Sequence, residues 1–294
     1  MAGTSPTLRV ASWNVRAAIG PGEPFPPAWW RHVDRDRLRR IAEVIRELDP
    51  DVVALQEVAV FNADGDFTDQ PAELARMTGM AVRYGAVHAY ALIEPERGHA
   101  IGAATWGNAL LARQPLDDGF TIGLPAGADD ELVEVAGSGL GLAGVRYAQA
   151  EAGAREPRCA IGGRLRGRGT SPSIVTAHLT YAGTGQRRAQ AEMLARIAAD
   201  LGTPTIVAGD FNAPIEAAEL AGLAGAFDDA FSGAGIEPGD PRRASCGMHG
   251  IDHLLARGLR TLDCHVHRAA GDASDHLPVV ATFEGGTPPI GWGG

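Results

Sequence analysis

Hydrophobic and polar positions along this chain form short apolar runs and one longer stretch with helical spacing in each half. In the first half, residues 8–15 are an apolar run that predicts a strand, and the Gly- and Pro-rich residues 20–27 interrupt regular structure. Apolar residues then recur at helical spacing over residues 38–48, which predicts an amphipathic helix. Residues 52–56 predict a second strand, so Glu57 is expected at the carboxyl end of that strand.

The second half repeats this order of elements. Residues 173–180 and 205–208 predict strands, and residues 186–201 predict the helix between them, with Gly202 at its end. Asp210 follows the second of these strands. Two similar strand-helix-strand units predict an α/β fold built from two packed halves.

Polar side chains stand where these four predicted strands end. Asn14 and His178 lie near the end of the first strand of each unit, and Glu57 and Asp210 follow the second. In α/β folds, ligand sites form where strand ends converge at one edge of a sheet. We therefore expect these four residues to share a site.

The rest of the chain has weaker patterns. Further strands are predicted at residues 108–113, 251–255 and 277–283. Loops are predicted at residues 137–144 and 164–173, and longer polar, Gly-rich connections that could carry specificity at 60–104 and 117–157.

No domain linker interrupts this pattern. The prediction is one domain over residues 1–284, followed by a disordered tail at 285–294, where Gly and Pro leave too little apolar surface for a packed structure. Hydrophobic residues make up 45% of the 294 residues, which is enough for a sizeable core, and no obligate protein partner is expected.

Charge and cysteine content narrow the functional classes. The chain has 36 Asp and Glu against 26 basic residues, all of them Arg, which argues against holding nucleic acid by bulk charge. Cys159, Cys246 and Cys264 have no metal-binding or disulfide spacing, so a reducing compartment, the cytoplasm, is expected. We find no signal peptide and no apolar run of the roughly 18 residues that a membrane span needs.

The segment Gly209-Asp210-Phe211-Asn212 offers chemistry at close spacing. On an extended backbone, Asp210 and Asn212 would project to the same side, where one could orient a water and the other donate to a phosphate oxygen. The structural alternative is an Asx-turn that closes the strand. Glu57 and Asn14 have similar alternatives, a solvent-facing carboxylate and a turn residue, but both also supply the oxygen ligands that Mg²⁺ prefers.

Two histidines complete the candidate set. His178 shares a strand face with Thr176 and Thr180, and this polar face favours a site over a buried structural histidine. His276 follows Asp275, and another acid, Asp252, lies upstream. An imidazole oriented by a carboxylate suits acid-base chemistry near neutral pH.

Seven blocks of the sequence, in order, resemble the endonuclease/exonuclease/phosphatase superfamily, to which deoxyribonuclease I belongs. They are SWN at 12–14, LQE at 55–57, GNALLAR at 107–113, TAHL at 176–179, GDFN at 209–212, GIDHLL at 250–255 and SDHLPV at 274–279. The resemblance implies a four-layer α/β sandwich with two central mixed β-sheets and a metal-dependent phosphoesterase site between them.

The resemblance also implies roles for single residues. Glu57 with Asn14 would hold Mg²⁺ or Mn²⁺, Asp275 would lie near the metal, and Asp210 would orient or deprotonate the attacking water. His178 and Asn212 would contact the scissile phosphate, while His276 would act with Asp252 as its carboxylate partner. Which group is the formal base stays open.

Subgroup features are only partly informative. The histidine of TAHL differs from the Asn-containing segment typical of abasic-site endonucleases, and Met248 to Asp252 lacks the cysteine-containing signature of inositol 5-phosphatases. The resemblance therefore implies a phosphate-ester substrate, with nucleic acid among the candidates. A phosphodiesterase or nuclease is the main hypothesis.

Two rival hypotheses remain at this level. A sphingomyelinase-like lipid phosphodiesterase would contact a membrane through an apolar edge, for which Pro24 to Trp30 is the candidate, although Trp29 and Trp30 could instead pack over the first helix. A binding module that has lost catalysis is disfavoured, because every expected polar position is retained.

Overall fold

Both predicted strand-helix-strand units are present in the computed structural model, and each belongs to a different β-sheet. Residues 7–22, 28–125, 157–166, 171–181 and 183–285 are described. The first unit is β1 (Thr7–Asn14), α1 (Arg35–Leu48) and β2 (Val52–Ala63), and the second is β8 (Ser173–His178), α3 (Thr184–Asp200) and β9 (Thr205–Asp210). In both units the two strands pair in parallel, as expected for strands joined by a crossover helix.

The first sheet has the strand order β12-β13-β1-β2-β5-β4, and β3 pairs with β2 off this path. Its remaining strands are β3 (Asp66–Asp69), β4 (Ala81–Ile93), β5 (Ala100–Ala112), β12 (Leu259–Val266) and β13 (Val279–Gly285). The second sheet has the order β10-β11-β9-β8-β7-β6. It is completed by β6 (Asp117–Leu124), β7 (Arg158–Arg164), β10 (Asp228–Asp229) and β11 (Asp252–Arg257). Both sheets mix parallel and antiparallel pairs.

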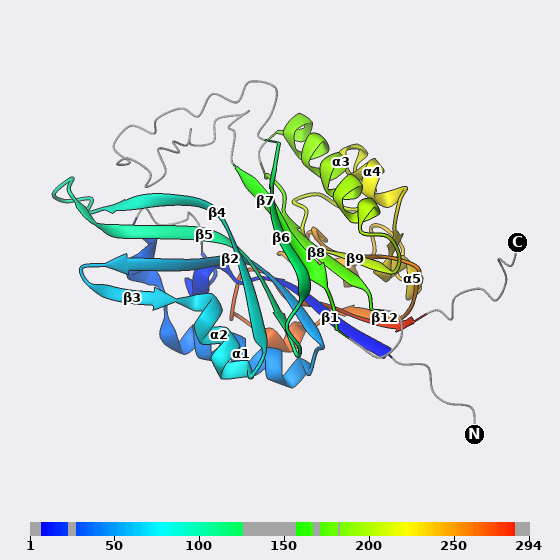
Figure 1. The fold of residues 1–294 in the computed structure, drawn as a ribbon, viewed down its shortest axis with the longest axis horizontal. Helices are drawn as coiled ribbons and strands as arrows, with labels where there is room; N and C mark the ends of the chain where they lie inside the picture. Colours follow the sequence, from blue (N-terminus) through cyan, green and yellow to red (C-terminus); the bar gives the residue numbers. More distant parts are fainter. Residues whose placement is uncertain (1–6, 23–27, 126–156, 167–170, 182, 286–294) are drawn as a thin grey trace, which may run out of the picture.

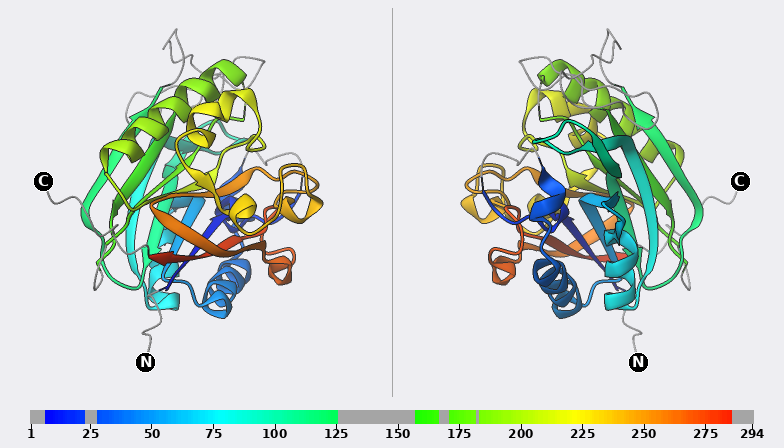
Figure 2. Two further views of the ribbon diagram at one scale, coloured as in Figure 1. Left: turned by 90° about the vertical axis from the view of Figure 1, so that its right-hand side faces the viewer. Right: turned by 90° about the vertical axis from the view of Figure 1, so that its left-hand side faces the viewer.

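Helices cover the outer face of each sheet (Figure 1). The remaining helices are α2 (Gln70–Thr78), α4 (Ala221–Ala224) and α5 (Ala230–Gly233), with the short 3-10 helices η1 (Arg16–Ala18), η2 (Trp29–His32), η3 (Ala218–Leu220), η4 (Pro241–Arg243) and η5 (Arg268–Ala270). Figure 2 views the sandwich edge-on, with α1 and α3 on opposite outer sides.

Three apolar clusters account for these layers. One packs α1 against the first sheet, with Leu38 and Ile45 on Trp13 and Leu55, and a second packs α3 against the other sheet. The third lies between the two sheets. The predicted four-layer α/β sandwich is therefore confirmed, and the candidates Asn14, Glu57, His178, Asp210 and Asp252 lie on the strands that its central cluster joins.

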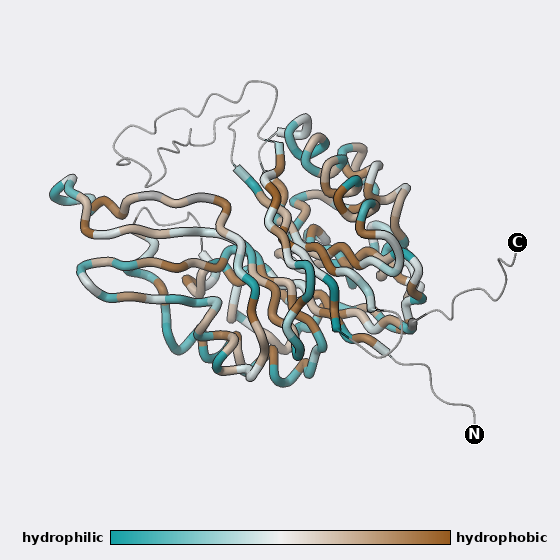
Figure 3. The backbone as a smooth tube through the Cα atoms, viewed as in Figure 1, coloured by the Kyte–Doolittle hydropathy of each residue, from teal (hydrophilic) through white to brown (hydrophobic). Residues whose placement is uncertain are grey.

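Residues 60–104 are not the polar connection that the sequence predicted. The strand β2 continues to Ala63, and β3, α2, β4 and the start of β5 follow. The β2–β3 and β4–β5 hairpins project together at the left of Figure 1, with hydrophilic turns and apolar residues along the strands (Figure 3). The alternation of apolar and polar residues in these hairpins is weak, because small residues stand where large apolar ones would be expected. The strands form there because they pair with one another. In the second predicted connection β6 forms; residues 126–156, which include the loop predicted at 137–144, and the tail from 286 lie outside the described residues.

Trp29 and Trp30 pack in an apolar cluster with the projecting strands, and not in the cluster that joins the first helix to its sheet. Trp29 is 5% exposed, and its ring contacts Phe61 on β2 and Trp106 on β5 at centroid distances of 5.2 and 5.0 Å. Because Trp29 is buried against the projecting strands, its ring is not exposed for contact with a membrane. Residues 23–27, which belong to the same candidate membrane-contacting segment, lie outside the described part of the chain. Among the described helices, none combines the length and apolar character needed to cross a membrane.

Candidate active site

The residues that face the space between the sheets change from apolar to polar along each central strand. Alternate residues of a strand share a face, so each strand contributes one inward series. Listed from apolar to polar, these series are Val10, Ser12 and Asn14 on β1; Val52, Ala54 and Gln56 on β2; Ile174, Thr176 and His178 on β8; Ile206, Ala208 and Asp210 on β9; and Ala256, Leu254 and Asp252 on β11. The polar ends gather at one end of the sandwich.

A buried polar layer separates this end from the apolar core. The Gln56 Nε2 group donates to Thr176 Oγ1 at 3.1 Å and to Ser12 Oγ at 3.4 Å, and all three residues are fully buried. The bond to Thr176 runs from one sheet to the other, and the bond to Ser12 joins β2 to β1 within the first sheet. They form a hydrogen-bonded floor beneath the candidate residues, which limits how far the strand ends can separate.

Asn14 joins the acids of the two sheets. Its Nδ2 group donates to Glu57 Oε1 at 2.9 Å and to Asp210 Oδ2 at 3.1 Å. His178 lies against the same two acids, with Nε2 3.4 Å from Asp210 Oδ2 and Nδ1 3.8 Å from Glu57 Oε1. The four residues that the sequence placed at separate strand ends therefore form one contact network.

Asp252 and His276 form the second part of the site. His276 Nδ1 is 2.8 Å from Asp252 Oδ2, and Ser245 donates its hydroxyl to the same oxygen at 2.6 Å. The strand pairing sets Asp252 directly opposite Asp210, and His276 Nε2 is 3.8 Å from Asp210 Oδ2. This pair is thus connected to the first network through Asp210.

Glu57 does not end its strand. It has a left-handed backbone, with φ of 56°, at a β-bulge where Gln56 and Glu57 together face Asn108 of β5. A bulge inserts one residue and redirects the side chains around it, which is common beside functional sites. The expected strand end is therefore corrected to a bulge within β2.

Asn212 combines the two alternatives that the sequence left open. Its backbone N–H donates to Asp210 Oδ1 at 3.0 Å, which is the Asx-turn, while its side-chain Nδ2 lies 2.9 Å from His178 Nε2 and donates to the Leu179 carbonyl. The φ of Asn212 is 52°, so the extended backbone that was predicted is wrong. The turn itself brings the amide to His178.

Asp275 lies on the more open side of the cluster. Its carboxylate is 3.4 Å from Arg16 Nε, and its side chain is 27% exposed against 19% for Glu57. By contrast, the side chains of Asp210 and Asp252 are 2% and 0% exposed. Burial raises the pKa of Glu57, and the negative charge of Asp275 raises it further.

Burial dominates the electrostatics of the site. It raises the pKa of Glu57, and together with the charge of Asp252 it raises the pKa of Asp210 to about 7. Burial also lowers the pKa of His178, and the positive charges of Arg158 and His276 lower it further, so His178 is neutral. Burial opposes protonation of His276 as well, but the charges of Asp252 and Asp210 outweigh it and raise its pKa.

Some residues of this site were not predicted. Ser245 donates a hydrogen bond to Asp252, and Cys246 forms an isolated β-bridge with His276. The charge of the buried Arg158 acts on both Glu57 and His178. No local pattern marks these positions, because an Arg before an apolar strand and a Ser-Cys pair in a Gly-rich segment are common in loops.

The cluster fits a divalent cation. One oxygen of Asp210, one of Asp252 and one nitrogen of His276 lie within 4.8 Å of one another. Four carboxylates, those of Glu57, Asp210, Asp252 and Asp275, meet in a largely buried space, and Asp252 Oδ1 has no hydrogen-bond partner among the described residues. Buried carboxylates are costly unless they are paired or bind a metal.

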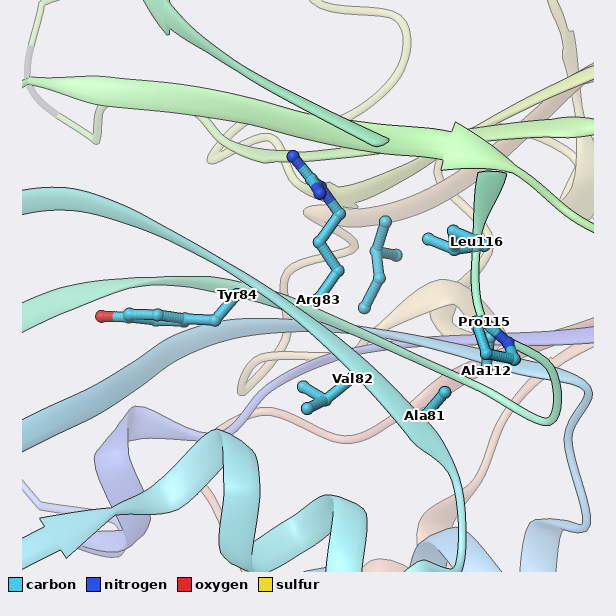
Figure 4. Close-up of a pocket in the computed structure, with 8 residues that line it drawn as sticks. Ala81, Val82, Arg83, Tyr84, Ala112, Pro115 and Leu116 are labelled. Atoms are coloured by element: carbon cyan, nitrogen blue, oxygen red, sulfur yellow. The ribbon is translucent and has the colours of Figure 1, made fainter. Parts of the chain in front are cut away.

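A cavity lined by described residues lies away from the acidic cluster. It has a volume of about 330 Å³ and opens beside the start of β4, where Arg83 points toward the second sheet and donates to the Phe120 carbonyl (Figure 4). Its residues include Ala112, which pairs with Val52 at the apolar end of β2. It therefore belongs to the opposite end of the sandwich from the acidic cluster.

A sequence model of the Endonuclease/Exonuclease/phosphatase family matches residues 11–276. This chain belongs to that family. Its members are generally hydrolytic phosphoesterases, so the matched region, which contains every candidate residue from Asn14 to His276, has the architecture of a phosphoesterase or nuclease family.

Solved structures of other family members have the same fold. An endonuclease/exonuclease/phosphatase from Beutenbergia cavernae DSM 12333 has a TM-score of 0.67 at 25% identity, covering 97% of this chain and 73% of that one. The human Nocturnin catalytic domain, with a bound sulfate anion, has a TM-score of 0.62 at 22% identity, covering 95% and 93%. TDP2 from C. elegans has a TM-score of 0.58 at 16% identity, covering 95% and 75%. No curated protein matches the sequence.

Proposed function

We propose that this family member is a divalent-metal-dependent phosphodiesterase that hydrolyses a phosphate ester at the cluster between its sheets. The observation that supports this most directly is the contact of Asn14 with both Glu57 and Asp210, since it joins an acid of each sheet at one point. A phosphodiesterase also needs donors for the non-bridging oxygens and a base for water, and the surrounding residues provide both.

Glu57, Asn14 and Asp275 are the proposed metal ligands. Glu57 and Asp275 are the more exposed acids of the cluster, and Mg²⁺ or Mn²⁺ usually keeps several waters, which favours this open side over the enclosed Asp252. The Asn14 oxygen accepts a bond from the Arg16 backbone and retains a second lone pair, while its Nδ2 group faces Glu57 and Asp210, so the carboxamide would turn to present its oxygen to an ion beside Glu57. When bound, the ion would neutralise charge on the phosphate and on the leaving oxygen.

The remaining residues would handle the phosphate and the protons. Neutral His178 and the amide of Asn212, 2.9 Å apart, would contact the non-bridging oxygens. Asp210, whose burial raises its pKa to about 7, would orient the attacking water and accept its proton as the new P–O bond forms. The Asp252 carboxylate would keep His276 protonated and aimed at the phosphate, while the bond to the leaving oxygen breaks.

The test is hydrolysis by protein stripped with EDTA and then supplied with Mg²⁺ or Mn²⁺. Bis-p-nitrophenyl phosphate, plasmid DNA, RNA, sphingomyelin and inositol phosphates would be assayed in parallel. We expect no turnover without metal, recovery with either ion, and loss in Glu57→Gln. Glu219→Gln is the matched control, because Glu219 has a similarly small exposure of 12% but pairs with Arg187 at 2.8 Å, away from the site. Full activity of Glu57→Gln in EDTA would refute the proposal.

A further inference from the structure

The residues that follow Asn14 have an unusual backbone. Arg16, Ala17 and Ala18 are all left-handed, with φ of 44°, 48° and 58°. For residues other than Gly this conformation is unfavourable by about 1 kcal/mol or more each, so surrounding contacts must hold it. The turn matters for the site because the Arg16 N–H donates to Asn14 Oδ1 at 3.0 Å, which directs the Asn14 Nδ2 group toward the acids.

A second irregular segment follows Glu57. On one edge, β2 pairs with β1 as far as Gln56 and with β3 only from Val60 onward. The N–H of Ala59, between these two pairings, has no strand partner on that edge, although Ala59 is fully buried. A buried N–H without a partner costs about as much as a lost hydrogen bond, so this gap needs an acceptor.

One side chain both contacts the left-handed turn and supplies the acceptor for the Ala59 N–H. Gln70, the first residue of α2, is fully buried. Its Oε1 accepts from the Ala59 N–H at 2.9 Å, and its Nε2 donates to the Ala17 carbonyl at 2.6 Å. The carboxamide thus joins the centre of the left-handed turn to the strand two residues beyond Glu57.

The placement of Gln70 is itself fixed by local structure. Asp69 caps α2 by accepting from the Ala72 N–H at 2.9 Å, and Pro71 occupies the first turn, where its missing N–H is not needed. The helix start therefore cannot easily shift relative to β3. Gln70 has little freedom to follow if the turn or the bulge moves.

We propose that Gln70 is a positioning residue of the metal site. It holds the turn that orients Asn14 and the bulge that carries Glu57, and so sets the distance between these two ligands. This inference rests on the proposed function, in which both residues hold a divalent ion. Residues beyond the direct ligands commonly alter metal affinity by 10- to 100-fold, because they fix the ligand geometry.

The second half of the chain supplies a matched control. Gln190 on α3 is also fully buried and also bridges two backbone groups, accepting from the Thr180 N–H at 2.8 Å and donating to the Pro125 carbonyl at 2.9 Å. Thr180 lies two residues beyond His178, so Gln190 supports the strand of the phosphate-contacting histidine. Both glutamines are fully buried and bridge two backbone groups, but Gln70 lies beside the segments of Asn14 and Glu57, whereas Gln190 lies beside the segment of His178.

The experiment compares Gln70→Met and Gln190→Met, in which a side chain of similar length loses both hydrogen bonds. Binding of Mn²⁺ to EDTA-stripped protein would be measured by titration calorimetry, and the midpoint of thermal unfolding would be recorded for each variant. We expect Gln70→Met to raise the Mn²⁺ dissociation constant about tenfold or more, and Gln190→Met to change it by less than about twofold. If the substitutions only made the protein less rigid in general, both unfolding midpoints would fall and the two variants would have similar Mn²⁺ dissociation constants.

Each outcome is decisive. An unchanged dissociation constant in folded Gln70→Met, or equal losses in both variants, overturns the positioning role. If Gln70→Met does not fold, Gln70→Glu replaces it, since the carboxylate still accepts from Ala59 but sets an oxygen against the Ala17 carbonyl in place of the donor. Weaker Mn²⁺ binding is again expected, and unchanged binding overturns the inference. Failure of the unsubstituted protein to bind Mn²⁺ overturns the proposed metal site itself, and that result is obtained before any variant is compared.

Discussion

At the scale of single residues, the site is organised by pairs whose charges depend on each other. Asp252 is fully buried and shares a 2.8 Å hydrogen bond with His276. The charges of Asp252 and Asp210 raise the pKa of His276 despite its burial, so the imidazole keeps its proton at neutral pH. Removal of the acid would remove both the charge and the orientation of the ring.

We therefore predict that Asp252 and His276 act as a unit. Asp252→Ala and His276→Ala should each lower kcat by about 10²-fold or more, and the double variant should lose little beyond the worse single one. Steady-state kinetics on a short diester would measure this, and additive losses would show that the residues act separately. His265→Ala is the control, because His265 forms an equivalent 2.9 Å contact with Asp263 on the exposed surface and should retain full activity.

At the scale of elements, the close approach of β8 and β9 positions His178 opposite Asp210. Gly209 pairs with Ala177 in this parallel ladder and has φ of 152°. A Cβ atom at Gly209 would lie 1.9 Å from the Ala177 carbonyl oxygen, and backbone cannot move aside as a flexible side chain can. Glycine is required here for packing, independently of catalysis.

Gly209→Ala should accordingly destabilise the protein by about 3 kcal/mol, because the two strands must separate to admit the methyl group. Gly123→Ala is the matched strand control. No atom lies within 4 Å of a Cβ at Gly123 in β6, so the change should stay within about 1 kcal/mol. Urea unfolding of both variants measures the difference, and equal free energies of unfolding would contradict the predicted clash.

At the scale of the whole molecule, charge limits how a polymer could be held. The formal net charge is −10, and the chain has no Lys. Among the Arg residues that a groove could draw on, Arg166 pairs with Asp117 at 2.6 Å, Arg164 ends β7, and Arg168 lies outside the described residues. Binding energy is therefore expected to concentrate at the scissile phosphate.

This distribution predicts a shallow salt dependence. The slope of log kcat/KM on plasmid DNA against log salt concentration should be much smaller in magnitude than the value of about −5 expected for six phosphate contacts. A short phosphodiester should be at least as good a substrate as duplex DNA. The measurement is kcat/KM for both substrates across a salt series, and a steep slope with strong preference for DNA would identify an Arg-lined nuclease groove instead.

Local patterns in the sequence were sufficient to predict both strand-helix-strand units, and the resemblance of seven sequence blocks to the family implied the two-sheet sandwich. Strand and helix periods, caps and turns depend on neighbouring residues, so they can be identified without knowing the fold. The same local patterns located Asn14, His178 and Asp210 at strand ends. They also indicated the Asx-turn at Asn212 as one of two alternatives.

Only the tertiary structure decided how these residues meet. The bulge at Glu57 depends on the pairing of β2 with β5, and the burial of Trp29 depends on the projecting hairpins that the sequence pattern did not reveal. The contact of Asn14 with Asp210 joins residues 196 positions apart, and the raised pKa of Asp210 comes from burial between two sheets. Such properties arise from long-range packing and desolvation, which no local pattern of residues encodes.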